Sequence, residues 1–158
     1  MKYEQKWAIA SFFDDLDDGY TFTGGDTPLH ATLASVFAID LSVEEIADII
    51  RVSVDGVNSF TVTVGADDLW GDIEVSLLKK SKEFSRLICS VQQALLAQGS
   101  IFNESQYLLD GFKPHVTHQG VGRLHTGDQQ LISKLSLVDM FPDSDGLKRR
   151  VVSTVNLA

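Results

Sequence analysis

The order of the strand-like and helix-like segments restricts the possible folds of this chain more than any other feature of its sequence. Helical periodicity occurs in two places, one after Ser42 and a longer one from Phe84 to Leu95. Ser42 and Glu45 form a capping-box pair, and Gly99 is a plausible end of the longer helix. Strand-like patterns occupy residues 7–13, 29–39, 60–64, 73–77, 112–119, 131–138 and 151–157.

The first half of the chain contains strand, strand, helix and strand, and the second half contains a similar set in the order strand, helix, strand, strand and strand. This weak repeat of architecture predicts an α+β fold: a two-lobed domain of pseudo-repeated antiparallel sheets, with helices on the outside and a central cleft. No linker rich in Pro, Gly or Ser divides the chain. We therefore expect residues 1–158 to form one domain whose lobes mix residues about 1–65 and 66–158.

The balance of charges restricts the partners of the chain. Its 158 residues include 13 Lys and Arg against 22 Asp and Glu, which gives a net charge of −9. This acidity argues against binding long duplex nucleic acid, but it allows a small nucleotide or a short RNA end in a narrow cleft. Cys89 is the only cysteine, so no internal disulfide forms. The apolar run Trp7–Phe13 is too short for a signal peptide or membrane span, so we expect a cytoplasmic protein.

Two of the four histidines are followed two positions later by threonine. The triplets are His30-Ala31-Thr32 and His115-Val116-Thr117, and both lie in strand-like segments. Residues i and i+2 of a strand point to the same face, so each triplet presents an imidazole beside a hydroxyl. The middle residue of each triplet points the other way, toward packing.

Two such units facing each other would make a phosphoryl-transfer site that needs no metal. One imidazole can take a proton from the attacking oxygen while the other gives one to the leaving oxygen. The two hydroxyls can donate hydrogen bonds to the phosphate oxygens. The alternative is a chance pair of triplets, but the position of one triplet on a strand in each half favours a paired site.

The segments Pro28-Leu-His-Ala-Thr-Leu33 and Phe112-Lys-Pro-His-Val-Thr117 resemble the signature strands of the two-histidine (2H) phosphoesterases. That superfamily includes 2′,3′-cyclic phosphodiesterases and the so-called 2′-5′ RNA ligases. The resemblance implies a two-lobed fold, with His30 and His115 as the catalytic pair and Thr32 and Thr117 binding phosphate. Many relatives continue the second motif with Leu-Ala-Arg, whereas this chain continues with His118-Gln-Gly120.

Four further features invite a functional interpretation beside a plainer one. Lys113 shares strand parity with His115 and could hold the phosphate, or it could simply face solvent. Trp70, in an expected loop, could stack on a base or pack. His118 should face away from His115 and be a packed or surface residue, so we predict no metal site and no cofactor. Lys148-Arg-Arg150 is a short basic run expected at a solvated edge.

The leading hypothesis is a metal-independent phosphodiesterase that hydrolyses a cyclic phosphate or a 2′-linked phosphodiester of a nucleotide or RNA end. The same site run in reverse would give weak RNA ligation. The alternatives are a nucleotide- or RNA-binding domain of the same fold with little turnover, and an enzyme that degrades cyclic oligonucleotide signals. The residues leave open which histidine is the acid, the base preference and the oligomeric state. The net charge of −9 favours imidazolium and should shift the active pH window upward.

Overall fold

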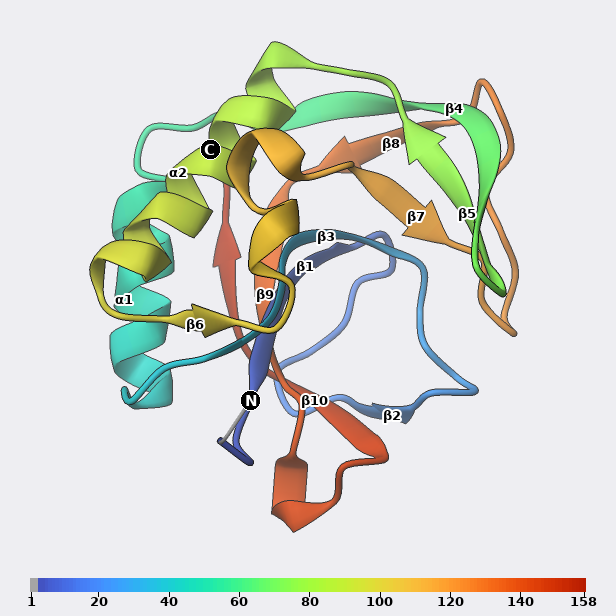
Figure 1. Ribbon diagram of the computed structural model, residues 1–158. Helices are drawn as coiled ribbons and strands as arrows, with labels where there is room; N and C mark the ends of the chain where they lie inside the picture. The colour runs from blue at the N-terminus through green and yellow to red at the C-terminus, as the bar shows by residue number, and fades with distance from the viewer. Residues whose placement is uncertain (1–2) are drawn as a thin grey trace.

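The computed structural model describes residues 3–158, and in this part of the chain the strands form two antiparallel sheets (Figure 1). The larger sheet has the order β2 (Thr21–Thr23), β10 (Lys148–Asn156), β9 (Lys134–Asp139), β1 (Trp7–Phe12), β3 (His30–Ala38) and β6 (Ile101–Phe102). The smaller sheet has the order β7 (His115–Thr117), β5 (Ile73–Leu78), β4 (Phe60–Trp70) and β8 (Gln129–Ile132). Each sheet therefore draws strands from both halves of the chain.

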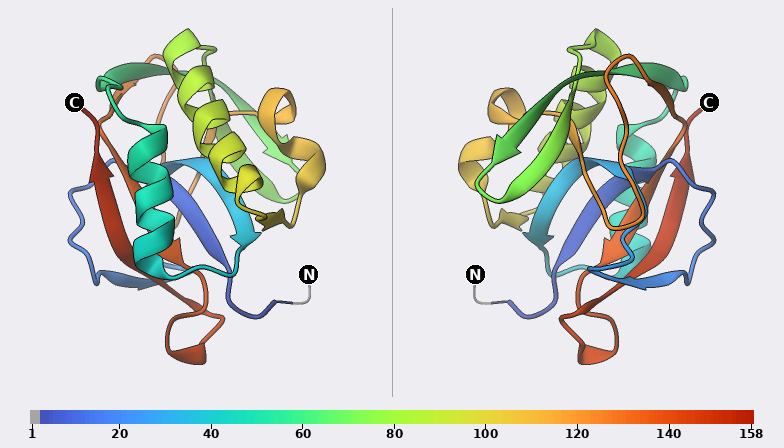
Figure 2. Two further views of the ribbon diagram at one scale, coloured as in Figure 1. Left: turned by 90° about the vertical axis from the view of Figure 1, so that its left-hand side faces the viewer. Right: turned by 90° about the vertical axis from the view of Figure 1, so that its right-hand side faces the viewer.

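Both helices cover the same face of the larger sheet, as Figure 2 shows from two sides. Helix α1 (Val43–Ser53) packs against β10, and helix α2 (Lys82–Ala97) packs against β3 and against α1. The predicted capping box is confirmed, because the Glu45 amide donates to the Ser42 hydroxyl at 3.2 Å and the Ser42 amide donates to the Glu45 carboxylate at 3.1 Å. Short 3-10 turns occupy Ser105–Tyr107, Leu109–Gly111 and Pro142–Ser144.

One continuous apolar core joins the helices to both sheets. Ile50 of α1 and Leu87 of α2 meet Leu33 of the larger sheet and Val62 of the smaller one. A second, smaller cluster lies on the opposite face of the larger sheet and contains Ala10, Phe12, Phe22, Val138 and Val151. The expected α+β architecture of two lobes with outer helices is confirmed. Within residues 3–158, no helix has the length and apolar character that a membrane span requires.

Several expected elements differ from the structure. The segment 131–138 is two strands, because Ser133 separates β8 of the smaller sheet from β9 of the larger sheet. The segment 112–119 is a strand only at β7, since a 3-10 turn ends at Gly111 just before it. Trp70 ends β4 and does not lie in a loop. The short strands β2 and β6 were not expected, and β10 begins at Lys148.

Gln92 ties the strand that carries His30 to the segment that leads into β7. Its side chain is fully buried in α2. The amide nitrogen donates to the Leu33 carbonyl at 2.9 Å, and the amide oxygen accepts from the Leu109 backbone at 2.7 Å. Two segments 76 residues apart (109 − 33) are thus held by one side chain that has no contact with solvent.

We expect the substitution Gln92→Leu to lower the free energy of unfolding by about 2–6 kcal/mol, because it removes the side-chain partner of the Leu33 carbonyl and of the partly buried Leu109 amide, at about 1–3 kcal/mol each. Urea unfolding followed by circular dichroism measures this change. The control is Gln93→Leu, at the exposed neighbouring position of the same helix. Equal unfolding midpoints for the two variants would contradict this role of Gln92.

Candidate active site

The two His-x-Thr triplets lie on strands β3 and β7, which pack against each other although they belong to different sheets. Ala31 and Val116, the middle residues, are buried in the shared core. His30 and His115 are partly buried, as are the two threonines. The alternation expected of each triplet is therefore present: one side chain of each is in the core, and the imidazole and hydroxyl are on the other face.

Both imidazoles are held by the same type of contact. Nδ1 of His30 lies 2.9 Å from the Pro28 carbonyl, and Nδ1 of His115 lies 2.8 Å from the Lys113 carbonyl. A carbonyl oxygen only accepts, so each Nδ1 carries the proton and donates it. In each neutral ring Nε2 is then the nitrogen with a free lone pair, and in each protonated ring it is a donor. The two imidazoles, one from each sheet, therefore have the same arrangement of donor and acceptor nitrogens.

An aromatic ring packs on each imidazole. Phe12 lies against His30 with ring centroids 5.1 Å apart, and Trp70 meets His115 edge-on at 4.3 Å. The Trp70 indole N–H donates to the Asp68 carboxylate at 2.8 Å. This bond is the first cause of a lowered pKa at Asp68, followed by the Leu69 amide and by the positive charge of Lys113. The hydrogen bond to Asp68 thus holds the Trp70 indole in place against the His115 ring.

Burial sets the protonation of the pair. It lowers the pKa of His30 below the ordinary imidazole value; the hydrogen bond to Pro28 raises that pKa, and the charge of His115 lowers it again. Burial also lowers the pKa of His115, against the opposing effect of the Lys113 carbonyl. The upward shift expected from the net charge is therefore wrong in direction, because desolvation of the imidazolium outweighs the distant carboxylates. The effect of His115 on His30 also places the two rings within electrostatic reach of each other.

The remaining predicted residues have different surroundings. Thr32 lines one pocket together with His30. Thr117 is partly buried on β7 and pairs with Val75 of β5. Lys113 precedes β7, so the parity argument for its side chain does not apply; its backbone carbonyl orients His115, and its exposed side chain lies near Asp68. A direct contact of Lys113 with phosphate stays a prediction.

The loops that adjoin the two triplets touch each other. Gly25 precedes β3, and Gly120 follows β7. A Cβ atom at Gly120 would lie 2.8 Å from the Gly25 carbonyl oxygen, which is closer than real Cβ contacts allow. The His118-Gln-Gly120 continuation of the second motif therefore brings the two lobes into backbone contact beside the site, and this requires glycine.

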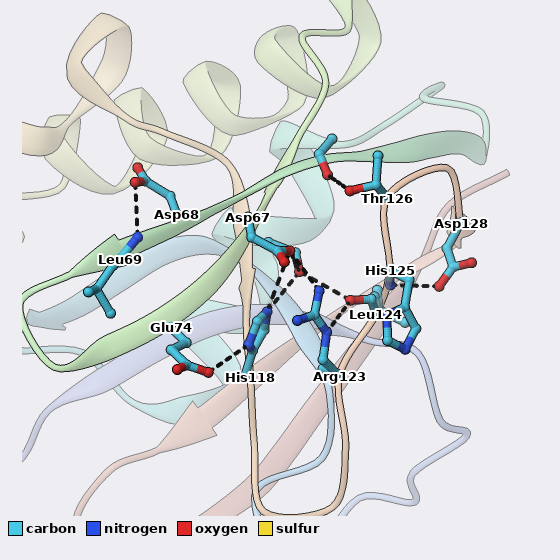
Figure 3. A network of polar contacts seen from close by, with 12 residues as sticks. Asp67, Asp68, Leu69, Glu74, His118, Arg123, Leu124, His125, Thr126 and Asp128 are labelled. Atoms are coloured by element: carbon cyan, nitrogen blue, oxygen red, sulfur yellow. Dashed lines mark hydrogen bonds and ion pairs between the residues drawn. The ribbon is translucent and has the colours of Figure 1, made fainter.

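His118 contacts Ser76, which pairs with buried Val116, so it lies on the face opposite to His115 as expected and belongs to a separate polar network (Figure 3). Its Nε2 lies 2.9 Å from the hydroxyl of buried Ser76, and its Nδ1 lies 3.4 Å from Glu74. Arg123 donates to Asp67 at 2.7 Å and holds the pKa of that carboxyl below its usual range. Sequence patterns did not reveal this network, which ties the loop after β7 to β4 and β5. Among residues 3–158, no group of three His, Cys, Asp or Glu side chains is placed to hold a metal ion.

The fold of this chain matches solved protein structures, whereas its sequence matches no protein-family model. No protein-family model and no curated protein sequence matches the chain. Solved structures do match. E. coli LigT complexed with 3′-AMP has a TM-score of 0.61 at 14% identity, and a structure described as a phosphoesterase has 0.60 at 14% identity; each match covers 98% of both chains. The chain has the LigT fold. A Thermus thermophilus protein shares this fold with a TM-score of 0.58 and 14% identity over 96% of this chain and 97% of its own. The LigT fold confirms the architecture implied by the two motifs.

We expect Trp70→Ala to raise the pKa of His115 toward the ordinary imidazole value, because removing the indole exposes the ring and burial is the main cause of the lowered pKa. The pKa of His30 should stay lowered. NMR titration of the imidazole C–H signals measures both values, and Leu69→Ala, at an exposed neighbour on β4, is the control. An unchanged or lower pKa of His115 in Trp70→Ala would contradict this account.

Proposed function

We propose that this chain is a single-domain, cytoplasmic, metal-independent phosphodiesterase that hydrolyses a cyclic phosphate or a 2′-linked phosphodiester of a nucleotide or RNA end. The observation that carries the proposal is the matched pair of imidazoles. Each is anchored through Nδ1 to a carbonyl two residues earlier, each precedes a threonine by two positions, and they come from adjacent strands of different sheets. A site that only binds nucleotides has no need of two nitrogen atoms prepared for proton transfer.

In the proposed reaction, Nε2 of neutral His30 takes a proton from a water molecule as the water oxygen bonds to phosphorus. The bond from phosphorus to the ribose oxygen breaks, and Nε2–H of protonated His115 gives its proton to that oxygen. The product is a phosphate monoester with a free ribose hydroxyl. Exchange with solvent then returns both rings to their starting forms. The hydroxyls of Thr32 and Thr117 donate to the non-bridging oxygens, where negative charge develops.

The assignment of roles rests on the different burial of the two rings. Repulsion between two imidazolium ions is mutual, but His30 is more deeply buried than His115, so the favoured singly protonated state has the proton on His115. His30 then serves as the base and His115 as the acid. With a ribose hydroxyl in place of water as the nucleophile, the same exchange of protons would join that hydroxyl to a cyclic phosphate as the ring P–O bond breaks, which is the RNA ligase side activity.

The solved structures with this fold support a small nucleotide as the substrate. LigT has been crystallised with 3′-AMP, with NADP+ and with ATP. An assay panel tests the proposal directly: 2′,3′-cyclic mononucleotides, ADP-ribose cyclic phosphate, 2′-5′ oligoadenylate and cyclic di- and trinucleotides, each with and without EDTA. Hydrolysis of at least one substrate with EDTA present is expected. Nucleotide binding without turnover would instead favour a binding domain, and turnover confined to the cyclic oligonucleotides would favour an enzyme that removes such signals.

We expect His30→Ala and His115→Ala each to lower kcat by about 100-fold or more, because each removes one proton-transfer group. Thr32→Val and Thr117→Val should each cost one charge-assisted hydrogen bond, roughly 1.5–3 kcal/mol of transition-state binding. Steady-state kinetics on the best substrate of the panel measures these losses. The controls are His125→Ala and Thr61→Val, both at exposed positions. Loss of activity in His125→Ala equal to that in His115→Ala would contradict the chosen pair.

The profile of kcat/KM against pH should be bell-shaped, with its maximum on the acid side of the ordinary imidazole pKa of about 6.5. The reason is that burial lowers the pKa of both rings in the free protein, and one ring must be neutral while the other is protonated. In the residual activity, His30→Ala should lose the acid limb and His115→Ala the alkaline limb. If His30→Ala lost the alkaline limb and His115→Ala lost the acid limb, His30 would be the acid and His115 the base. A flat profile between about pH 5 and pH 9 would exclude this mechanism.

A further inference from the structure

A pocket of about 290 Å³ is lined by the second apolar cluster, on the face of the larger sheet opposite to the helices. His30 and Thr32 line one side of it. The small side chains Ala8 and Ala10 of β1 and Val138 of β9 also line it, with part of the second apolar cluster. A ligand held through phosphate by His30 and Thr32 would therefore have an apolar surface directly beside it.

Arg149 lines the same pocket from the start of β10. It stands opposite Phe22 in the pairing of β10 with β2, and Phe22 also lines the pocket. The basic run that contains Arg149 was expected at a solvated edge, but Arg149 is partly buried. It brings a full positive charge to a pocket whose lining is otherwise mostly apolar.

The guanidinium of Arg149 is held by one of its three nitrogens. Nη1 donates to the carbonyls of Met140 at 3.1 Å, Gly146 at 2.8 Å and Lys148 at 2.8 Å. Within residues 3–158, Nε and Nη2 make no hydrogen bond or ion pair. These two nitrogens form the edge of a guanidinium that makes paired hydrogen bonds to two neighbouring acceptors. The turn between β9 and β10 thus fixes the group and leaves its pairing edge available.

We propose, on the basis of the proposed function, that this pocket receives the nucleobase of the substrate and that Arg149 selects guanine over adenine. A flat base can lie on the alanine and valine surface, whereas a second phosphate would lose its hydration against apolar groups. Guanine presents O6 and N7 as two adjacent acceptors, which match Nε–H and Nη2–H. Adenine replaces O6 by an amino group, so one donor of Arg149 would face another donor.

The test compares kcat/KM for 2′,3′-cyclic GMP and 2′,3′-cyclic AMP. The wild-type chain should prefer the guanine substrate by about 10-fold or more. In Arg149→Met the preference should vanish because activity on the guanine substrate falls to the adenine level. Arg149→Lys keeps the charge without the paired edge and should lose the preference as well. Arg150→Met is the matched control, since Arg150 pairs with Asp143 at 2.6 Å and does not line the pocket; it should keep the preference.

Activity on the adenine substrate reports whether each variant is folded. Equal use of the two substrates by the wild-type chain, or a guanine preference that survives in a folded Arg149→Met, would overturn the proposal. Calorimetric binding of 5′-GMP and 5′-AMP to the wild-type chain and to Arg149→Met separates it from the proposed function. Tighter, Arg149-dependent binding of 5′-GMP without turnover of any substrate would support the pocket and reject the phosphodiesterase. Turnover without any base preference would support the phosphodiesterase and reject the guanine pocket.

Discussion

The hydrogen bond from each imidazole Nδ1 to the carbonyl two residues earlier is the constraint on which the candidate site depends. It holds the His30 ring against the Pro28 carbonyl and the His115 ring against the Lys113 carbonyl, each just before the strand that the histidine begins. It also fixes which nitrogen carries the permanent proton, so Nε2 is left for chemistry in both rings. Burial of Ala31 and Val116 on the reverse face holds each strand in this position. The core and the site are therefore two faces of the same pair of strands.

The aromatic neighbours of the two imidazoles lower the pKa values on which the proposed proton transfers depend. Phe12 and Trp70 shield the two rings from water, and this burial lowers both pKa values. A free protein near neutral pH then holds both imidazoles mostly neutral, although the proposed reaction needs one of them protonated. An anionic phosphate between the rings opposes this effect, because a nearby negative charge favours imidazolium. On the proposed mechanism, the substrate itself thus helps to load the general acid, and the fully prepared site exists only with substrate bound.

Periodicity within the sequence predicted what depends on neighbouring residues. The two triplets, the capping box at Ser42 and both helices follow from spacing over a few residues, and the structure contains all of them. The division of residues 131–138 between two sheets did not follow, because an apolar run has the same pattern whichever partner strand it meets. The short strand β2 exists through its pairing with β10, and Trp70 belongs to β4 through its pairing with Ile73. Such features depend on contacts between distant segments, which periodicity does not record.

Arg149 shows that the net charge of a sequence likewise does not record where a single charged side chain lies in the fold. A sum over the chain gives −9 and describes how the whole surface meets a long polyanion, which it repels. The net charge does not reveal that three backbone carbonyls hold the guanidinium of Arg149 in one place. That guanidinium supplies hydrogen-bond donors to a pocket that His30 also lines. The net charge of the whole surface and the local charges at the site both affect which substrate can bind. Repulsion by the acidic surface grows with the number of phosphates, whereas on the proposed mechanism the paired imidazoles and Arg149 would each contact one group of the substrate. This combination favours a ligand with a single base and few phosphates over a long strand.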